Sequence, residues 1–212
     1  MTGDSVGQIL DGVWRSEAVH PEWTEDEGGD EGWEPLVGSW AVSSPDGLVL
    51  VDPLVDDWRA LDQLVEDQGG CAGIVRTCHW HERSIAEAAK RYGAAVWAKA
   101  APVDGASPPY DHAVSDREEL FERITAFDVE RNDEIALWLA PQRALIFGDA
   151  MLRRGGGDLV VCPESWTQPP GGPARLRSLL GGLTELPVEH VLVSHGPLVL
   201  GDGLRALRAA TS

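Results

Sequence analysis

The stretch TCHWHERSIAEAAKRYGAAVWA, residues 77 to 98, places two histidines between a predicted strand and a predicted helix. The preceding AGIVRTC (72–78) has the composition of a strand, whereas SIAEAAKRYG (84–93) is helical in composition and ends at a glycine. His79 and His81 therefore directly follow the end of a strand. Alternate side chains of an extended segment point the same way, so a His-x-His pair can bind one metal ion.

Three further polar residues also follow apolar, β-rich runs. Asp52 comes after GLVLV, Asp149 after ALIFG and His195 after VLVS. Apolar strands that each end in an imidazole or a carboxylate bring those groups to one edge of the sheets. Such side chains are typical ligands of a cation, so the sequence predicts a site at this edge.

The remaining pattern alternates helices and strands. Residues 38–55 form two β-rich runs separated by Ser-Pro-Asp-Gly, which favours a hairpin. Apolar spacing and glycine boundaries predict helices over 56–68, 84–93, 171–183 and 202–210, and strands within 124–130, 134–140, 143–149 and 190–195. This order favours layered sheets with helices packed outside.

Four segments in this order resemble the metallo-β-lactamase-fold hydrolases, which include glyoxalase II-like thioesterases, lactonases and lactamases. They are GSWAVSSPDGLVLVDPLV (38–55), the stretch 77–98, EIALWLAPQRALIFGDAML (134–152) and HVLVSHGPLVLGDG (190–203). The resemblance implies an α+β fold, a four-layer αβ/βα sandwich with two mixed β-sheets flanked by helices. We expect a single domain, 1–212, whose first half ends near residue 110.

The sequence departs from the family's His-x-His-x-Asp-His motif. Arg83 stands at the position of the Asp and Ser84 at that of the last His, both of which ligate a second metal in the family. The family's third-motif histidine aligns near Glu130. A guanidinium at the second site disfavours a cation there.

What remains is a partial ligand set. The resemblance implies that His79, His81, Asp149, His195 and, at the third motif, Glu130 hold the metal, with Asp149 and Arg83 as catalytic residues. A His/His/carboxylate set is compatible with one zinc or iron ion and leaves a position open for water. Metal-bound water can ionise near neutral pH and attack a carbonyl. We therefore expect a hydrolase of a small ester, thioester or lactone with at most one metal ion.

The same residues also allow a metal-free interpretation. Arg83 would pair with Asp149 or Glu130 in place of a cation, which keeps the carboxylates ionised without catalysis. The protein would then be a non-catalytic member of the fold that binds a small molecule or takes part in an assembly. In both interpretations we expect Arg83 within salt-bridge reach of one of these carboxylates.

Composition limits the partners. A formal charge of -18 and a pI near 4.5 oppose binding to nucleic acid or to anionic membranes. No apolar run is long enough to span a bilayer and no signal-peptide pattern is present, so we expect a cytoplasmic protein with a small-molecule substrate, and the sequence also allows a homo-oligomer.

The three cysteines lack C-x-x-C spacing. Cys78, beside His79, is either a buried core residue or a soft ligand.

Nine tryptophans are an unusual aromatic choice, and Trp14, Trp23 and Trp33 fall within the first 33 residues. They either fill the core or line a pocket, because indole combines a large apolar face with one N–H donor.

Overall fold

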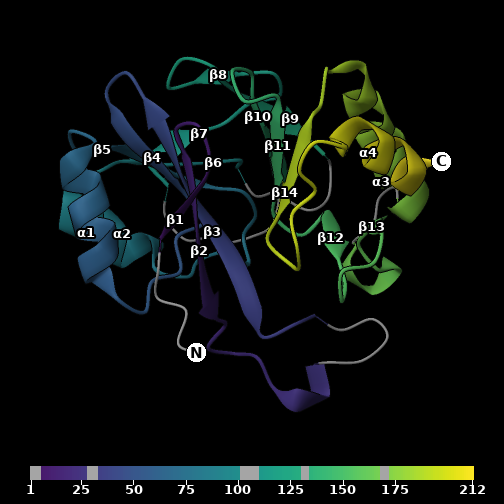
Figure 1. Cartoon of the computed structure of the whole chain (residues 1–212), viewed down its shortest axis with the longest axis horizontal. Helices are drawn as coiled ribbons and strands as arrows, with labels where there is room; N and C mark the ends of the chain where they lie inside the picture. The colour runs from purple at the N-terminus through teal and green to yellow at the C-terminus, as the bar shows by residue number, and fades with distance from the viewer. Residues whose placement is uncertain (1–5, 28–32, 101–109, 130–133, 168–171) are drawn as a thin grey trace.

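Two β-sheets face each other at the centre of the molecule, and helices cover the outer side of each (Figure 1). This computed structural model describes residues 6–27, 33–100, 110–129, 134–167 and 172–212.

The first sheet contains seven strands in the order β1-β2-β3-β4-β5-β6-β7. Pairing is antiparallel from β1 to β4 and parallel from β4 to β7. Helices α1 (Trp58–Asp67) and α2 (Ile85–Tyr92) connect the parallel strands. The strands are β1 (Gly7–Leu10), β2 (Val13–Val19), β3 (Leu36–Ser44), β4 (Gly47–Val51), β5 (Cys71–Arg76), β6 (Val96–Ala98) and β7 (His112–Ala113).

The second sheet has the order β14-β11-β10-β9-β8, with the pair β11 and β14 parallel and the others antiparallel. Its strands are β8 (Glu119–Leu120), β9 (Ile124–Asp128), β10 (Ile135–Leu139), β11 (Ala144–Phe147) and β14 (His190–Val193). Helices α3 (Gly172–Gly182) and α4 (Gly203–Thr211) lie on its outer side (Figure 1).

Three apolar layers hold these elements together. Between the sheets, inward side chains such as Val51 and Val75 meet Leu137 and Ile146. A second layer packs the first sheet against α1 and α2, and a third packs the second sheet against α3 and α4. Burial of apolar surface on both faces of each sheet stabilises the stacking. The predicted α+β four-layer sandwich is thereby confirmed.

Local sequence signals explain the helix boundaries. The Asp57 carboxylate caps α1 by accepting a hydrogen bond from the Arg59 amide, and Gly93 ends α2 with a φ of 64°, a conformation glycine adopts without strain. Short 3₁₀ turns also occur at η1 (Glu25–Glu27), η2 (Glu164–Trp166) and η3 (Leu183–Glu185).

One two-stranded sheet was not expected. Strands β12 (Met151–Arg153) and β13 (Leu159–Val161) pair antiparallel after the Gly148-Asp149 turn. Three consecutive glycines, 155 to 157, lie between the two strands. From the sequence alone they indicate a loop and give no sign of the strands on either side. Within the described residues, no helix has the length and hydrophobicity needed to cross a membrane.

Candidate active site

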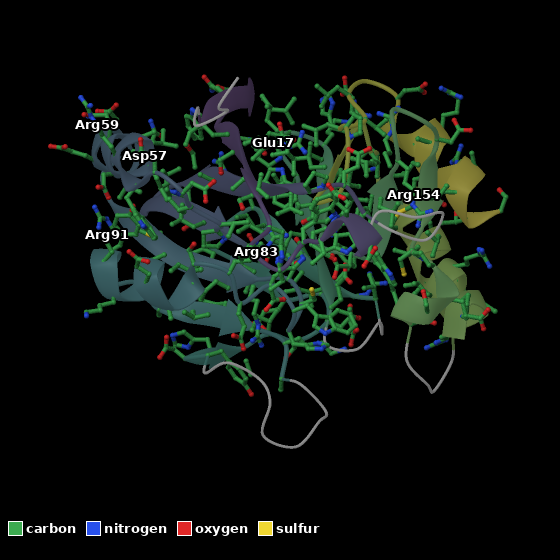
Figure 2. The ribbon with its side chains drawn as sticks, turned by 90° about the horizontal axis from the view of Figure 1, so that it is seen from below. Glu17, Asp57, Arg59, Arg83, Arg91 and Arg154 are labelled. Carbon is green, nitrogen blue, oxygen red and sulfur yellow. The ribbon has the colours of Figure 1, made fainter. Side chains whose placement is uncertain are left out.

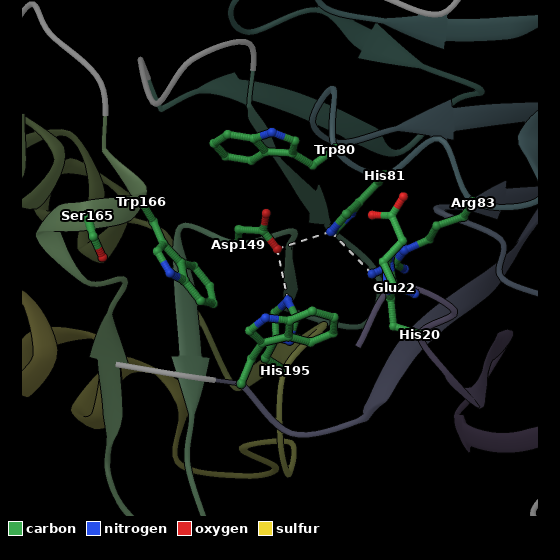
Figure 3. A pocket seen from close by; sticks show the side chains of 10 residues that line it. His20, Glu22, Trp80, His81, Arg83, Asp149, Ser165, Trp166 and His195 are labelled. Carbon is green, nitrogen blue, oxygen red and sulfur yellow. Dashed lines mark hydrogen bonds and ion pairs between the residues drawn. The ribbon is translucent and has the colours of Figure 1, made fainter. Parts of the chain in front are cut away.

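Three strand ends bring two histidines and a carboxylate into contact. His81 follows β5, Asp149 follows β11 and His195 follows β14, and all three side chains are buried. Asp149 Oδ1 lies 3.0 Å from His81 Nε2 and 3.0 Å from His195 Nε2 (Figure 3). These side chains meet at one edge of the sheets, as expected, although His81 and His195 lie 68 and 46 positions from Asp149 in the chain.

Asp52, which directly follows β4, fixes the orientation of the His81 ring by accepting a hydrogen bond from Nδ1. Its carboxylate has no exposed surface and accepts hydrogen bonds from the Thr77 amide (2.8 Å), the Thr77 hydroxyl (2.5 Å) and His81 Nδ1 (2.8 Å). Burial is the largest influence on the Asp52 pKa and raises it, but the charge and hydrogen bond of His81, with Arg83 and Thr77, lower it below its usual value. A charged Asp52 fixes a proton on His81 Nδ1.

Opposing effects act on the pKa of His81. Burial is the largest influence on its pKa and lowers it, as does the charge of Arg83. Cys78, Asp52 and Asp149 act in the opposite sense, and the pKa lies well above its usual value. Each ring nitrogen faces one carboxylate: Nδ1 lies 2.8 Å from Asp52 Oδ2 and Nε2 lies 3.0 Å from Asp149 Oδ1.

Arg83 points into the site and contacts two backbone carbonyls and His81. One guanidinium nitrogen donates to the backbone carbonyls of Gly38 (2.9 Å) and Asp52 (3.0 Å), and the other lies 3.2 Å from His81 Nε2. Figure 2 shows Arg83 near the middle of the view, whereas Arg59 and Arg91 lie at one side. Burial lowers the pKa of the Arg83 guanidinium, and the charges of Asp52 and Asp149 oppose this effect.

The chain turns directly after β5, and this turn brings Cys78, rather than His79, to the same side as His81. The His81 amide donates to the Cys78 carbonyl (3.1 Å), so Cys78 and His81 face the same side. Cys78 Sγ lies 3.6 Å from Asp149 Oδ2. His79 is half-buried, and its ring packs against that of Trp80 with centroids 4.2 Å apart.

Ser84 and Glu130 are the two remaining positions of the family motifs. Ser84 accepts a hydrogen bond from the Val55 amide (3.0 Å), a contact that holds the start of α2 against the loop after β4. Glu130, a predicted metal ligand, lies outside the described residues.

Sequence reasoning missed Glu134, which holds the turn that carries Asp149. Its buried Oε1 accepts hydrogen bonds from the amides of Asp149 (3.0 Å) and Ala150 (2.8 Å). The only signal in the sequence is an acidic residue at the start of an otherwise apolar strand. Gly148 leaves room for this arrangement, since a Cβ there would lie 2.5 Å from the Thr77 hydroxyl.

A cavity of about 380 Å³ opens above the cluster (Figure 3). Indole rings form much of its wall: Trp33 and Trp166 both contact the His195 ring edge to face, with centroids 5.3 and 5.6 Å away, and Trp80 is 44% exposed. Burial lowers the pKa of His195, against the opposing effect of Asp149. Of the early tryptophans, Trp33 lines this cavity and Trp14 packs in the core.

Polar residues complete the wall of the cavity. His20 and Glu22, from the segment after β2, and Ser165, from η2, line the cavity together with Arg83. Burial lowers the pKa of His20, as does the nearby Arg83 charge. The cavity therefore combines an aromatic wall with charged groups at its floor, an arrangement typical of a small-molecule site.

The residues present fit one metal ion. Cys78, His81 and Asp149 offer one ligand atom each, all within 4.8 Å of one another and all buried. The hydrogen bond from His81 Nδ1 to Asp52 is the contact by which proteins orient a metal-binding imidazole. Cys78, His81 and Asp149 are the one cluster of three or more such residues found in the part of the chain that the structure describes.

The family follows from these features and from comparison. A family description of the metallo-beta-lactamase superfamily matches residues 37–211, and the chain belongs to this superfamily. Comparison with curated proteins gives no match.

Several solved structures share the fold at low sequence identity. The metallo-beta-lactamase DIM-1 is similar with a TM-score of 0.69 and 13% identity, covering 97% of this chain and 95% of that one. A metallo-beta-lactamase from Pontibacter korlensis gives 0.68 and 16%, covering 98% of each chain. FIM-1 from Pseudomonas aeruginosa, in its mono-zinc form, gives 0.66 and 17%, covering 98% and 94%.

Proposed function

We propose that the protein is a metal-dependent hydrolase that acts on a small ester, thioester or lactone with a single metal ion. The observation that carries this proposal is the contact of Asp149 Oδ1 with His81 and His195, both at 3.0 Å, at the floor of an open cavity. Asp149 and His81 offer the oxygen and nitrogen ligands that divalent zinc or iron accepts.

Charge supports one ion rather than two. Asp52 and Asp149 contribute two buried negative charges, and Arg83 contributes one positive charge to the same site. With His81 neutral, one divalent ion leaves these groups with a single excess positive charge, whereas a second ion would leave three in a buried site. The structurally similar FIM-1 has been obtained in a mono-zinc form.

The chain's own residues divide the work of such a site. A bound ion would polarise a carbonyl and lower the pKa of a water molecule. Asp52 holds the proton of His81 on Nδ1, which leaves Nε2 free as a ligand. His195 Nε2 contacts Asp149 from the cavity side, where it can hold a proton for the departing group.

The cavity wall suits the remainder of the substrate. Trp33, Trp80 and Trp166 offer apolar faces to an acyl chain or ring and exclude water from the floor. The Arg83 guanidinium supplies a fixed positive charge beside the floor, where an oxyanion develops when a carbonyl is attacked.

A second candidate function is small-molecule binding without catalysis. The observation that favours it is the 3.2 Å contact between Arg83 and His81 Nε2, because this contact uses the nitrogen that a metal needs. In that case the cavity binds its ligand over a charge network that is already balanced internally.

Metal analysis and hydrolysis distinguish the two. Protein purified without chelators should contain about one zinc or iron per chain and should hydrolyse at least one compound from a panel of nitrophenyl esters, acyl thioesters and lactones. Asp149→Asn should lose both metal and activity, whereas His112→Ala, which alters an exposed histidine that stacks on Trp97 on the β6–β7 side, should keep both. A metal-free, inactive protein that binds small molecules would support the second function.

A further inference from the structure

We infer that Cys78 is a thiolate ligand of the metal ion and that His79 is not a ligand. The inference rests on the proposed metal site and specifies its ligands as Cys78, His81 and Asp149, with the fourth position open to the cavity. His195 then acts as a hydrogen-bond partner of Asp149 rather than as a ligand.

Geometry favours the thiol over the neighbouring imidazole. Cys78 Sγ lies 3.6 Å from Asp149 Oδ2, close to the ~3.6 Å that separates a sulfur and an oxygen ligand on one tetrahedral zinc ion. Cys78, His81 and Asp149 form the one cluster among the described residues whose ligand atoms all lie within 4.8 Å of one another. His79 instead packs on Trp80, whose ring is partly in solvent.

The local backbone explains why the thiol, not the imidazole, faces inward. The bond from the His81 amide to the Cys78 carbonyl closes a turn, and residues three apart in such a turn share one side. An extended His-x-His segment would have brought His79 and His81 to the same side instead. Asp52 then fixes the inward ring of His81 through Nδ1.

Binding of the ion exchanges protons for metal bonds. Burial raises the pKa of the Cys78 thiol to about 12. Cys78 would bind a divalent ion as the thiolate, so its proton would be released to solvent on binding. His81 would bind through a neutral Nε2, with Asp52 holding the proton on Nδ1.

The ligand set also predicts which metal is preferred. Thiolate and imidazole favour zinc or cobalt, whereas magnesium and manganese prefer sites made of oxygen alone. With three protein ligands, the fourth position stays free for water or substrate, which is the coordination typical of catalytic rather than structural zinc. His195 remains outside this set, because it contacts Asp149 but is not part of the cluster.

The test is cobalt substitution of the full chain. Co²⁺ added to the apoprotein should bind at one equivalent and give a near-ultraviolet thiolate-to-cobalt charge-transfer band. Cys78→Ser and Cys78→Ala should abolish the band and weaken zinc binding by more than 100-fold, beyond the ~10–100-fold expected when only a hydrogen-bond partner of a ligand is lost. His195→Gln should fall within that smaller range and keep the band.

Two control variants isolate the role of the thiol. Cys71→Ser alters a half-buried thiol that donates to the Gly73 carbonyl, a bond that serine can also make, and should leave the band unchanged. His79→Ala should keep both the band and one equivalent of cobalt. Circular dichroism and thermal unfolding of each apoprotein show whether the variant folds.

The outcomes separate this inference from the proposed function. Cobalt bound at one equivalent without a charge-transfer band, or lost in His79→Ala but retained in Cys78→Ala, overturns the thiolate assignment and leaves the metal-dependent site standing. Failure of the folded wild-type protein to bind cobalt or zinc at all overturns both. A band present in the wild type and in Cys71→Ser, and absent from both Cys78 variants, supports the inference.

Discussion

Glu134 offers the most direct test of how the site is held together. Replacing it with alanine removes the acceptor of two buried amide hydrogen bonds, those of Asp149 (3.0 Å) and Ala150 (2.8 Å). Glu134 and Ala150 have no exposed surface, so water does not readily replace the lost acceptor. An unsatisfied buried donor costs about 1–3 kcal/mol. Two of them predict a loss of about 2–6 kcal/mol in the free energy of unfolding.

Glu134→Gln is the matched control, because its amide oxygen accepts the same two hydrogen bonds without the charge. A hydrogen bond to a charged group exceeds a neutral one by roughly 1 kcal/mol, so this variant should lose about half as much stability as Glu134→Ala, or less. Urea denaturation of the two variants, both free of metal, measures this difference in stability. It appears as a shift in the midpoint urea concentration while the dependence of the unfolding free energy on urea keeps the same slope. Equal destabilisation by the two substitutions, or none by alanine, would refute the role assigned to the two hydrogen bonds.

Further substitutions test neighbouring contacts. Gly148→Ala should destabilise the protein by about 1–3 kcal/mol in chemical denaturation, because the added Cβ lies 2.5 Å from the Thr77 hydroxyl. Arg83→Ala leaves two backbone carbonyls without their charged donor and should cost about 1.5–3 kcal/mol in the same assay. The hydrogen bond from Arg91 lowers the pKa of Asp62, so its contribution to stability is present above pH ~3.9 and lost as pH falls through the folded pKa. Asp62→Asn should therefore make unfolding less sensitive to acid, as thermal melts from pH 2 to 6 would show.

Much of the fold could be predicted because its signals are local. The hairpin around Ser-Pro-Asp-Gly, the glycine that ends α2 and the apolar run of β10 each depend on residues close in sequence. The strand pair β12 and β13 could not be predicted. The glycines between the two strands indicate only a loop, and the pairing of the strands depends on the surrounding tertiary packing.

The site could be predicted to the level of strand ends but not of individual side chains. Asp52, His81, Asp149 and His195 converge as expected, since neighbouring strands end at a common edge. The direction of each side chain after the strand depends on the turn, and one hydrogen bond, from the His81 amide to the Cys78 carbonyl, brings Cys78 inward. No periodicity in the sequence reveals a turn of this kind inside a loop.

The unusual backbone at two positions ties the floor of the site together. Asp52 and Arg83 both have positive φ, 48° and 39°, which costs energy for residues other than glycine. Hydrogen bonds at these positions offset that cost. The Asp52 carbonyl accepts one from the Arg83 guanidinium, and the Asp52 carboxylate accepts others from the Thr77 amide and from His81. Arg83 therefore holds the end of β4, and with it the carboxylate that orients His81.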